Sequence, residues 1–338
     1  MKKHHFHILH SNLLLWYEKN GRKNLPWRNL ESPLCDKKIQ NIQRAYGVYI
    51  SEIMLQQTQV KRVLENFYFP FLSQFPHLES LAKANDNELL KAWQGLGFYT
   101  RARNLKKSAL ECMQNFNGNL PQDLKALQSL SGVGAYTAGA IACFGFNQAV
   151  SFFDSNIARV LSRLFGLENP NPKELQTRAD SFLNTEDAFN HNQALLDLGA
   201  LVCLPNNPKC GLCPLYETCK GKYSPALYYK KKKTLYQRRD LKLFFIEHNA
   251  TFAVQKSTEK LYNGLYNFPC TNTTHNNKKA KFLGEFKHSY TKYKLYIKMY
   301  HYKTSQRLNE YEFKTIEELD TMPLSALSLK ALKYLQKK

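Results

Sequence analysis

Residues 131–140 read Ser-Gly-Val-Gly-Ala-Tyr-Thr-Ala-Gly-Ala, and this stretch decides the fold of the first half of the chain. Apolar periodicity predicts one helix that begins at Pro121 and a second helix, rich in small residues, after the turn. The glycines of the turn Gly132-Val133-Gly134 allow φ above zero and a close approach of another backbone. Amide groups at the start of the second helix can hold a phosphate oxygen. We therefore expect a hairpin at about 122–140 that grips a nucleic-acid backbone, although glycines are also common in helix–helix turns that bind nothing.

The spacing of apolar residues divides the chain into two domains. From residue 1 to 222 the spacing is helical, so we expect an all-α domain. Residues 223–240 are basic and have little periodic apolar content, which is typical of a linker. In residues 241–338 the apolar period becomes two, most clearly in Tyr293–Met299, and it returns to helical spacing from Asp320 onward. We expect a smaller α+β domain there.

The charge balance favours a polyanionic partner. The 338 residues include 48 lysines and arginines against 27 acidic residues, a formal net charge of +21. Nucleic acid is the first candidate partner and an anionic membrane surface the second. No stretch approaches the roughly 20 apolar residues of a spanning helix, and the first ten residues contain no apolar signal-peptide core. We expect a cytoplasmic protein without a membrane partner.

Four of the eight cysteines gather in one short segment, 203–219. Cys203, Cys210, Cys213 and Cys219 are separated by six, two and five residues, so their thiolates can converge in one loop. Zinc is more often held by two separated C-x-x-C pairs, whereas four cysteines around a single such pair favour a 4Fe-4S cluster. Unliganded core cysteines are a poor alternative, because prolines and a glycine leave this loop without a helical face to bury.

These features together resemble the helix-hairpin-helix iron–sulfur DNA glycosylase superfamily, and within it most of all the MutY-type adenine DNA glycosylases. Besides the hairpin and the cysteine loop, the matching segments are Leu25-Pro26-Trp27-Arg28, Ser51 to Val60, Gly95-Leu96-Gly97-Phe98-Tyr99 and Asp154-Ser155-Asn156. The resemblance runs from about Leu13 to Cys219 and more thinly to the C-terminus. An insertion at about 31–45 departs from the family. The resemblance implies a mainly α helix-hairpin-helix glycosylase fold for the first domain.

Two carboxylates carry the chemistry that the resemblance implies. Breaking a glycosidic bond needs an acid for the leaving group and a negative charge beside the cationic sugar. Helical periodicity alone makes Glu52 a solvated surface residue, but the family match makes it the general acid toward adenine N7, with a pKa raised by burial. Asp154 is by position a helix N-cap. The resemblance makes it the stabilising anion, and we expect helix amides to lower its pKa. Asn156 resembles a family asparagine that contacts this site.

Tyr136 distinguishes this sequence from the sister family of endonuclease III-like glycosylase-lyases. By resemblance, those enzymes carry at this position a lysine that attacks the sugar as a Schiff-base nucleophile. Tyrosine cannot form that imine, so we expect a monofunctional glycosylase that hydrolyses the N-glycosidic bond and leaves the strand intact. The resemblance also implies residues that wedge into the duplex or line the base pocket, and for each of them plain packing is the alternative: Gln57, Phe98, Trp27, Arg28, Leu55 and Gln193.

The second domain resembles the Nudix-like C-terminal domain of these glycosylases, which reads oxidised guanine opposite adenine. The segment Gly264–Pro269 carries part of this resemblance, while the metal-binding glutamates of the Nudix hydrolase box are absent. We therefore expect recognition without hydrolysis. Where the family has Phe-Ser-His in its reading loop, this chain has Tyr290, Thr291 and Lys292, which weakens the expected preference for oxidised guanine.

Taken with the sequence, the resemblance implies an adenine DNA glycosylase of a bacterial cytoplasm, and we expect it to be associated with the nucleoid and monomeric. Its expected partner is double-stranded DNA with A:8-oxoguanine or A:G mispairs, from which it would flip and excise adenine. Two alternatives remain open at this level. One is an endonuclease III-like glycosylase-lyase, and the other is an iron–sulfur protein that binds nucleic acid without catalysis.

Overall fold

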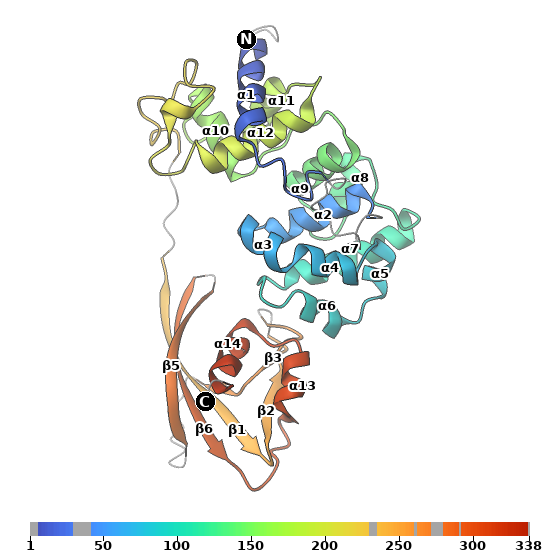
Figure 1. The fold of residues 1–338 in the computed structure, drawn as a ribbon, viewed down its shortest axis with the longest axis vertical. Helices are drawn as coiled ribbons and strands as arrows, with labels where there is room; N and C mark the ends of the chain where they lie inside the picture. Colours follow the sequence, from blue (N-terminus) through green and yellow to red (C-terminus); the bar gives the residue numbers. More distant parts are fainter. Residues whose placement is uncertain are drawn as a thin grey trace. The chain divides into compact units, whose positions relative to one another are not determined.

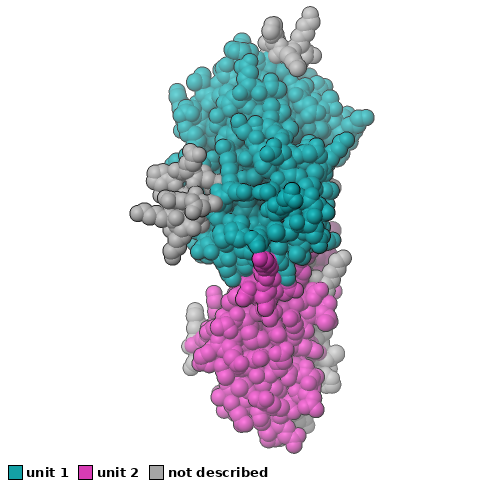
Figure 2. Space-filling view, turned by 90° about the vertical axis from the view of Figure 1, so that its right-hand side faces the viewer, with its two compact units in different colours: residues 1–82, 104–232 teal, residues 83–103, 233–338 magenta. Residues whose placement is uncertain are grey.

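Contacts within the computed structural model divide the chain into two compact units, which Figure 2 distinguishes by colour. The first unit is Met1–Ala82 with Asn104–Lys232, and the second is Lys83–Arg103 with Lys233–Lys338. The structure describes residues 6–29, 42–229, 235–259, 262–271, 280–290 and 292–336. The greater part of the insertion, Thr291 of the expected reading loop and Lys230–Lys233 of the linker lie outside the described residues, as does the side chain of Tyr290.

The first unit is helical, which confirms the predicted fold class of this half (Figure 1). The α-helices that lie wholly or mostly in it are α1 (His7–Asn20), α2 (Arg44–Leu55), α3 (Val60–Asn66), α4 (Tyr68–Gln74), α5 (Leu78–Lys83), α7 (Thr100–Asn115), α8 (Leu124–Ser129), α9 (Ala135–Ala140), α10 (Ser155–Phe165), α11 (Pro172–Phe182) and α12 (Ala188–Leu201). A π-helical turn, Ile141–Gly145, continues α9, and a short 3-10 turn, Cys210–Leu212, lies in the cysteine loop. Among the described residues, no helix is both long and apolar enough to cross a membrane.

Helix α2 is buried along almost its whole length, from Ala45 to Met54. It packs against α3, α4, α9 and the π-helical turn, so neighbours cover it on more than one side. The periodicity of the sequence made Glu52 an ordinary solvated residue, and that interpretation is wrong. A central helix has no solvated face, because flanking helices cover the side that an amphipathic pattern would leave to water.

The predicted hairpin is present, but its first helix begins later than expected. Helix α8 begins at Leu124 rather than at Pro121, because Asp123 is its N-cap and accepts a hydrogen bond from the Ala126 amide at 2.8 Å. In the turn, Gly132 has a φ of +79°, and a Cβ there would lie 2.7 Å from the Asn104 side chain. Both the backbone angle and the close contact therefore require glycine.

The second unit contains a mixed sheet whose main strand order is β3-β2-β1-β6-β5. Its strands are β1 (Gln237–His248), β2 (Thr251–Lys256), β3 (Tyr266–Asn267), β4 (Cys270–Thr271), β5 (Lys281–Tyr290), β6 (Tyr293–Lys303) and β7 (Glu312–Lys314), and its helices are α6 (Asp86–Ala92), α13 (Ile316–Thr321) and α14 (Ala326–Leu335). Strands β1 and β6 are parallel, and β5 and β6 form an antiparallel hairpin. Leucines of α13 and α14 pack on one face of this sheet.

Strand β1 begins at Gln237, inside the range 223–240 that the sequence assigned to the linker. The guanidinium groups of Arg238 and Arg239 each lie 4.1 Å from a tyrosine ring of β6, Tyr296 and Tyr293 respectively. These contacts hold a charged segment in the sheet although it contains few apolar residues. The C-terminal helical region likewise begins earlier than predicted, at Ile316.

Candidate active site

A cavity of about 520 Å³ opens in the first unit beside the C-terminal end of α2. The start of α10, part of α12 and the segment that precedes α2 also contribute to its wall. Nine side chains that the sequence singled out line this one cavity: Trp27, Arg28, Glu52, Leu55, Gln57, Tyr136, Asp154, Asn156 and Gln193. These residues come from distant parts of the chain, so the fold brings together the predicted catalytic and base-contacting groups.

Glu52 is 7% exposed, although it lines the cavity. Burial raises its pKa from the ordinary 4.5 to about 7, because the charged form loses its hydration. A hydrogen bond with Tyr136 and the charge of Arg28 act in the opposite direction, while the charge of Asp154 raises the pKa further. A carboxyl group with this pKa can hold a proton near neutral pH and release it.

Asp154 is the N-cap of α10, as its position in the sequence predicted. Its Oδ1 accepts hydrogen bonds from the amides of Asn156 and Ile157, both at 2.8 Å, and its Oδ2 accepts one from Asn156 Nδ2 at 2.9 Å. We expected these bonds to lower its pKa, but the net direction is upward because burial outweighs them. Both carboxylate oxygens nevertheless act as acceptors, which favours the anionic form.

The phenol of Tyr136 is close enough to both carboxylates for their charges to affect its pKa. Its phenol shares a hydrogen bond with Glu52, and burial together with the charges of Glu52 and Asp154 raises its pKa well above the ordinary value of 10. The hydroxyl is therefore a neutral hydrogen-bonding group at physiological pH. Its ring contacts Phe152 edge-on, with centroids 5.4 Å apart.

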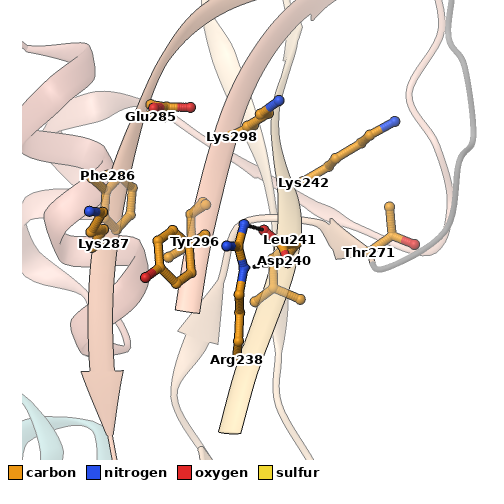
Figure 3. A pocket seen from close by; sticks show the side chains of 11 residues that line it. Arg238, Asp240, Leu241, Lys242, Thr271, Glu285, Phe286, Lys287, Tyr296 and Lys298 are labelled. Carbon is orange, nitrogen blue, oxygen red and sulfur yellow. Dashed lines mark hydrogen bonds and ion pairs between the residues drawn. The ribbon is translucent and has the colours of Figure 1, made fainter. Parts of the chain in front are cut away.

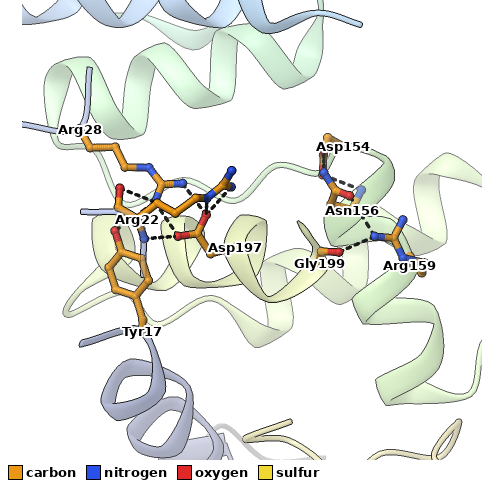
Figure 4. Close-up of polar contacts among 8 residues, drawn as sticks. All are labelled: Tyr17, Arg22, Arg28, Asp154, Asn156, Arg159, Asp197 and Gly199. Atoms are coloured by element: carbon orange, nitrogen blue, oxygen red, sulfur yellow. Dashed lines mark hydrogen bonds and ion pairs between the residues drawn. The ribbon is translucent and has the colours of Figure 1, made fainter. Parts of the chain in front are cut away.

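A buried ion cluster that the sequence analysis missed supports one wall of the cavity (Figure 4). The side chain of Asp197, on α12, is fully buried and binds two arginines. Arg28 donates to it at 2.7 and 2.9 Å, and Arg22 donates its backbone amide at 2.7 Å and its Nε at 2.9 Å. Burial tends to raise the pKa of Asp197, but the arginine contacts lower it overall. A single carboxylate in the apolar run Ala-Leu-Leu-Asp-Leu was the signal that could have revealed it, because such a group needs a cationic partner.

Helix α10 joins Asp154 to the cysteine loop through the half-buried Asn156 and the buried Arg159 (Figure 4). Asn156 donates to Asp154 and accepts from Arg159 Nη2 at 2.9 Å. Arg159, 2% exposed, also donates to the carbonyl of Gly199 at 2.7 Å and to that of Cys203 at 2.6 Å. Arg159 was not among the residues predicted from the sequence, although its position three residues after Asn156 was an available signal.

The four clustered cysteines line one small cavity. All four are free, and burial raises the pKa of Cys213 to about 12, with added repulsion from the other three sulfurs. Arg163 Nη1 lies 3.3 Å from Cys203 Sγ. Within the part of the chain that the structure describes, no three ligand residues converge closely enough for a single metal ion. The donor set of four half-buried thiols fits a polynuclear cluster, which spaces its ligands more widely.

Residues 50–184 match the family described as "HhH-GPD superfamily base excision DNA repair protein". The chain is 36% identical over 309 residues to an adenine DNA glycosylase of Buchnera aphidicola subsp. Baizongia pistaciae, covering 86% of this chain and 84% of that protein. The chain belongs to the adenine DNA glycosylase family. The human family member is 38% identical over 217 residues, which cover 62% of this chain and 39% of the human protein.

Solved structures agree with this family on the fold of the helical part. A thermostable thymine-DNA glycosylase matches with a TM-score of 0.57 and 28% identity, covering 64% of this chain and 95% of that chain. A trapped endonuclease III–DNA covalent intermediate matches with a TM-score of 0.54 at 18% identity, covering 66% of this chain and 98% of that chain, which shows the fold alone. This family member therefore has the helix-hairpin-helix glycosylase fold that the sequence predicted.

The structure does not bring every predicted contact residue of this family member to the cavity. Gly132, Val133 and Gly134 lie outside its lining, in the turn between α8 and α9. Phe98 belongs to the second unit, where it is 47% exposed with a φ of +48°. The Arg101 guanidinium lies 5.7 Å from its ring, and Arg101 Nη2 donates to the carbonyls of the preceding loop at 3.2 and 3.1 Å.

Proposed function

We propose that this protein is a monofunctional adenine DNA glycosylase that excises adenine mispaired with 8-oxoguanine or guanine in duplex DNA. One observation carries this proposal. A carboxyl group that holds a proton near neutral pH and a second carboxylate line the same cavity, together with a buried amide acceptor. Family membership supports the choice of adenine.

In this mechanism Glu52 donates its proton to N7 of the flipped adenine as the C1′–N9 bond breaks. The bonding electron pair leaves with the base, and the sugar becomes an oxocarbenium-like cation. Asp154 stabilises that cation, and its hydrogen bonds to the start of α10 keep the carboxylate in place. Water then adds to C1′ and loses a proton, which leaves an abasic site and an intact strand. Tyr136 acts as a neutral hydrogen-bond partner of Glu52.

Gln193 supports the assignment of adenine as the excised base. Its side chain is 2% exposed, and its Oε1 has no hydrogen-bond partner within the described residues. A buried acceptor without a donor is costly. The exocyclic amino group of adenine would supply that donor, while Trp27 and Leu55 offer apolar surface to the ring. We propose that Arg28 contacts the bound nucleotide from the same wall.

Two further groups would hold the DNA. We propose that Gly132, Val133 and Gly134 present backbone amides to a phosphate. No atom lies within 4 Å of the position that a Cβ on Gly134 would occupy, so a phosphate can approach the backbone there. Gln57 and Phe98 would enter the duplex as the base flips out. Both are exposed, and both have positive φ although they are not glycines, which is strain that often accompanies a functional role.

The cysteine loop would hold a 4Fe-4S cluster through Cys203, Cys210, Cys213 and Cys219. Four half-buried thiols around one small cavity support this assignment. The bound cluster would cross-link the loop and neutralise the mutual repulsion of its thiolates. Arg159 and Arg163 would then connect the loop to the Asn156–Asp154 end of α10 through their bonds to Cys203.

The second unit would serve as the reader of the base opposite adenine. We propose that residues 241–338 form a Nudix-like recognition domain after a helical domain at 1–222, and that Tyr290 and Thr291 take part in recognition. The mixed sheet and the place of Tyr290 at the end of β5 support that role. We expect the protein to act as a monomer.

The decisive experiment compares duplexes with a central A:8-oxoguanine, A:G, A:C or A:T pair. Alkali after incubation reveals abasic sites, and we expect them with the first two substrates and not with A:T. Borohydride should trap no covalent enzyme–DNA complex. Efficient trapping with strand cleavage would instead indicate a glycosylase-lyase. DNA binding without excision of any of these adenines would indicate a non-enzymatic iron–sulfur protein.

The pKa of Glu52 leads to a prediction for the pH dependence of excision. Only the protonated form can act as an acid, so kcat/KM on an A:8-oxoguanine duplex should fall as the pH rises through about 7, approaching tenfold per pH unit. Single-turnover rates across this range measure the effect, and duplex affinity measured at the same pH values is the control. A rate that stays constant up to about pH 9 would remove Glu52 as the acid.

A further inference from the structure

The second unit has a groove of about 640 Å³ on the sheet formed by β1, β6 and β5 (Figure 3). In β6, Leu295, Ile297 and Met299 are buried against α13 and α14. Successive side chains of a strand point to opposite faces. The intervening residues Tyr296 and Lys298 therefore lie on the face away from these helices.

This face carries an excess of positive charge. Its cations come from all three strands: Arg238, Lys242, Lys287, Lys294 and Lys298, against the two acids Asp240 and Glu285. Arg238 forms an ion pair with Asp240, with contacts of 2.8 and 3.0 Å. The amines of Lys242, Lys287 and Lys298 have no carboxylate within ion-pair distance among the described residues. These amines are available to an anionic ligand.

Aromatic rings alternate with the cations along the same face. Tyr296 lies below the guanidinium of Arg238, and Lys287 Nζ is 5.3 Å from the same ring. Farther along β6, Tyr300 stacks on Phe244 with centroids 5.6 Å apart and an interplanar angle of 25°. Phe282, 51% exposed, approaches Tyr300 edge-on at 5.7 Å. Alternate residues of a strand are about 6.6 Å apart, so rings and amines repeat along one line.

We propose that this face, lined by Lys242, Phe282, Tyr296, Lys298 and Tyr300, binds single-stranded DNA. Lysines along a groove neutralise phosphates, and exposed aromatic rings stack on bases without regard to their identity. Duplex DNA matches the charge but keeps its bases stacked on one another, so the rings would gain no partner. An acidic peptide would also pair with the lysines but would offer no stacking partner to the exposed ring of Phe282 or to the half-buried rings of Tyr296 and Tyr300. This site is separate from the proposed adenine cavity and does not depend on its activity.

The test measures binding of the full-length protein to a fluorescein-labelled 12-nucleotide oligothymidine by anisotropy. The variant Lys298→Glu should weaken this binding about tenfold. It should also reduce the magnitude of the slope of log K against log salt concentration by roughly 1. Tyr300→Thr keeps a residue that favours strands and removes the ring, and it should weaken binding about five- to tenfold. The matched control is Lys333→Glu on α14, whose exposed lysine lies on the helix that covers the other face.

The proposal is overturned if Lys298→Glu and Lys333→Glu weaken binding equally, because that result indicates only the overall charge. It is also overturned if Tyr300→Thr binds as the native protein does, or if Lys298→Glu weakens a fully paired duplex as strongly as the oligothymidine. Displacement of the oligothymidine by polyglutamate at equal charge would indicate an acidic-protein site instead. A photo-crosslink from 5-iododeoxyuridine should map to the β6 peptide. Excision from A:8-oxoguanine duplexes should be unchanged in all three variants.

Discussion

Replacing Glu52 with glutamine should lower the single-turnover rate of adenine excision by about 10²- to 10⁴-fold, the usual contribution of a general acid. Glutamine has nearly the same shape and can share a hydrogen bond with Tyr136, but it cannot release a proton to N7. Quantification of abasic sites in an A:8-oxoguanine duplex measures the loss. Affinity for the same duplex should remain within a few-fold of the native value, because Glu52 is not a phosphate contact.

The stability of this variant separates loss of chemistry from loss of structure. The pKa of Glu52 is about 7 in the folded protein against an ordinary 4.5, so the folded state binds the proton more tightly than the unfolded state. The resulting stabilisation is complete below pH 4.5 and is lost as the pH rises through 7, a difference of up to about 3 kcal/mol. Glutamine avoids this loss. The variant should therefore melt at the same or a higher temperature than the native protein at about pH 8, and a lower melting temperature would contradict the burial argument.

Replacing Asp197 with asparagine should lower the free energy of unfolding by about 3–5 kcal/mol. The substitution removes the negative charge that two arginines share, and the Arg28 side chain, only 6% exposed, would remain charged without its carboxylate. Arg28 already lowers the pKa of Glu52, and without Asp197 it can turn further toward Glu52. We therefore also expect the fall of kcat/KM with pH to begin at a lower pH. Denaturant unfolding and the pH profile of excision measure the two effects.

The matched control for this prediction is Glu65→Gln, which also converts a carboxylate to an amide. Glu65 is 54% exposed and pairs with Lys61 at 3.7 Å across one helical turn, an arrangement worth less than about 1 kcal/mol. A similar loss of stability in both variants would show that the buried cluster has no special role. An unchanged pH profile in Asp197→Asn would mean that Arg28 keeps its position without its partner.

Local sequence patterns predicted the features that depend on neighbouring residues. The glycine turn between α8 and α9, the clustered cysteines and the alternating residues of β6 each follow from spacing within a dozen residues. The N-cap position of Asp154 is of the same kind, because a cap bonds amides two and three residues ahead. Local patterns do not fix where a helix begins. Both Pro121 and Asp123 can precede a helix, and in the structure Asp123 is the N-cap of α8.

The electrostatic state of the candidate site depended on groups far apart in the chain. Asp154 has its expected amide bonds, yet its pKa rises because burial by other helices outweighs them. The partners of Asp197 are 175 and 169 residues away, so no local pattern could pair them. Only the resemblance to a family, and not periodicity, predicted Glu52 as the general acid.

The order of side chains in the sequence determined the helices of the hairpin and the alternating strands of the sheet, while the resemblance to a family identified the residues that now share one cavity. Backbone propensity and capping act over a few residues, so they can be read from the order of side chains. Only the tertiary structure decided which of those side chains lose contact with water and which charges face one another. A pKa depends on hydration and on all neighbouring charges in space, and the packing of α2, α10 and α12 with the segment at 22–28 sets both.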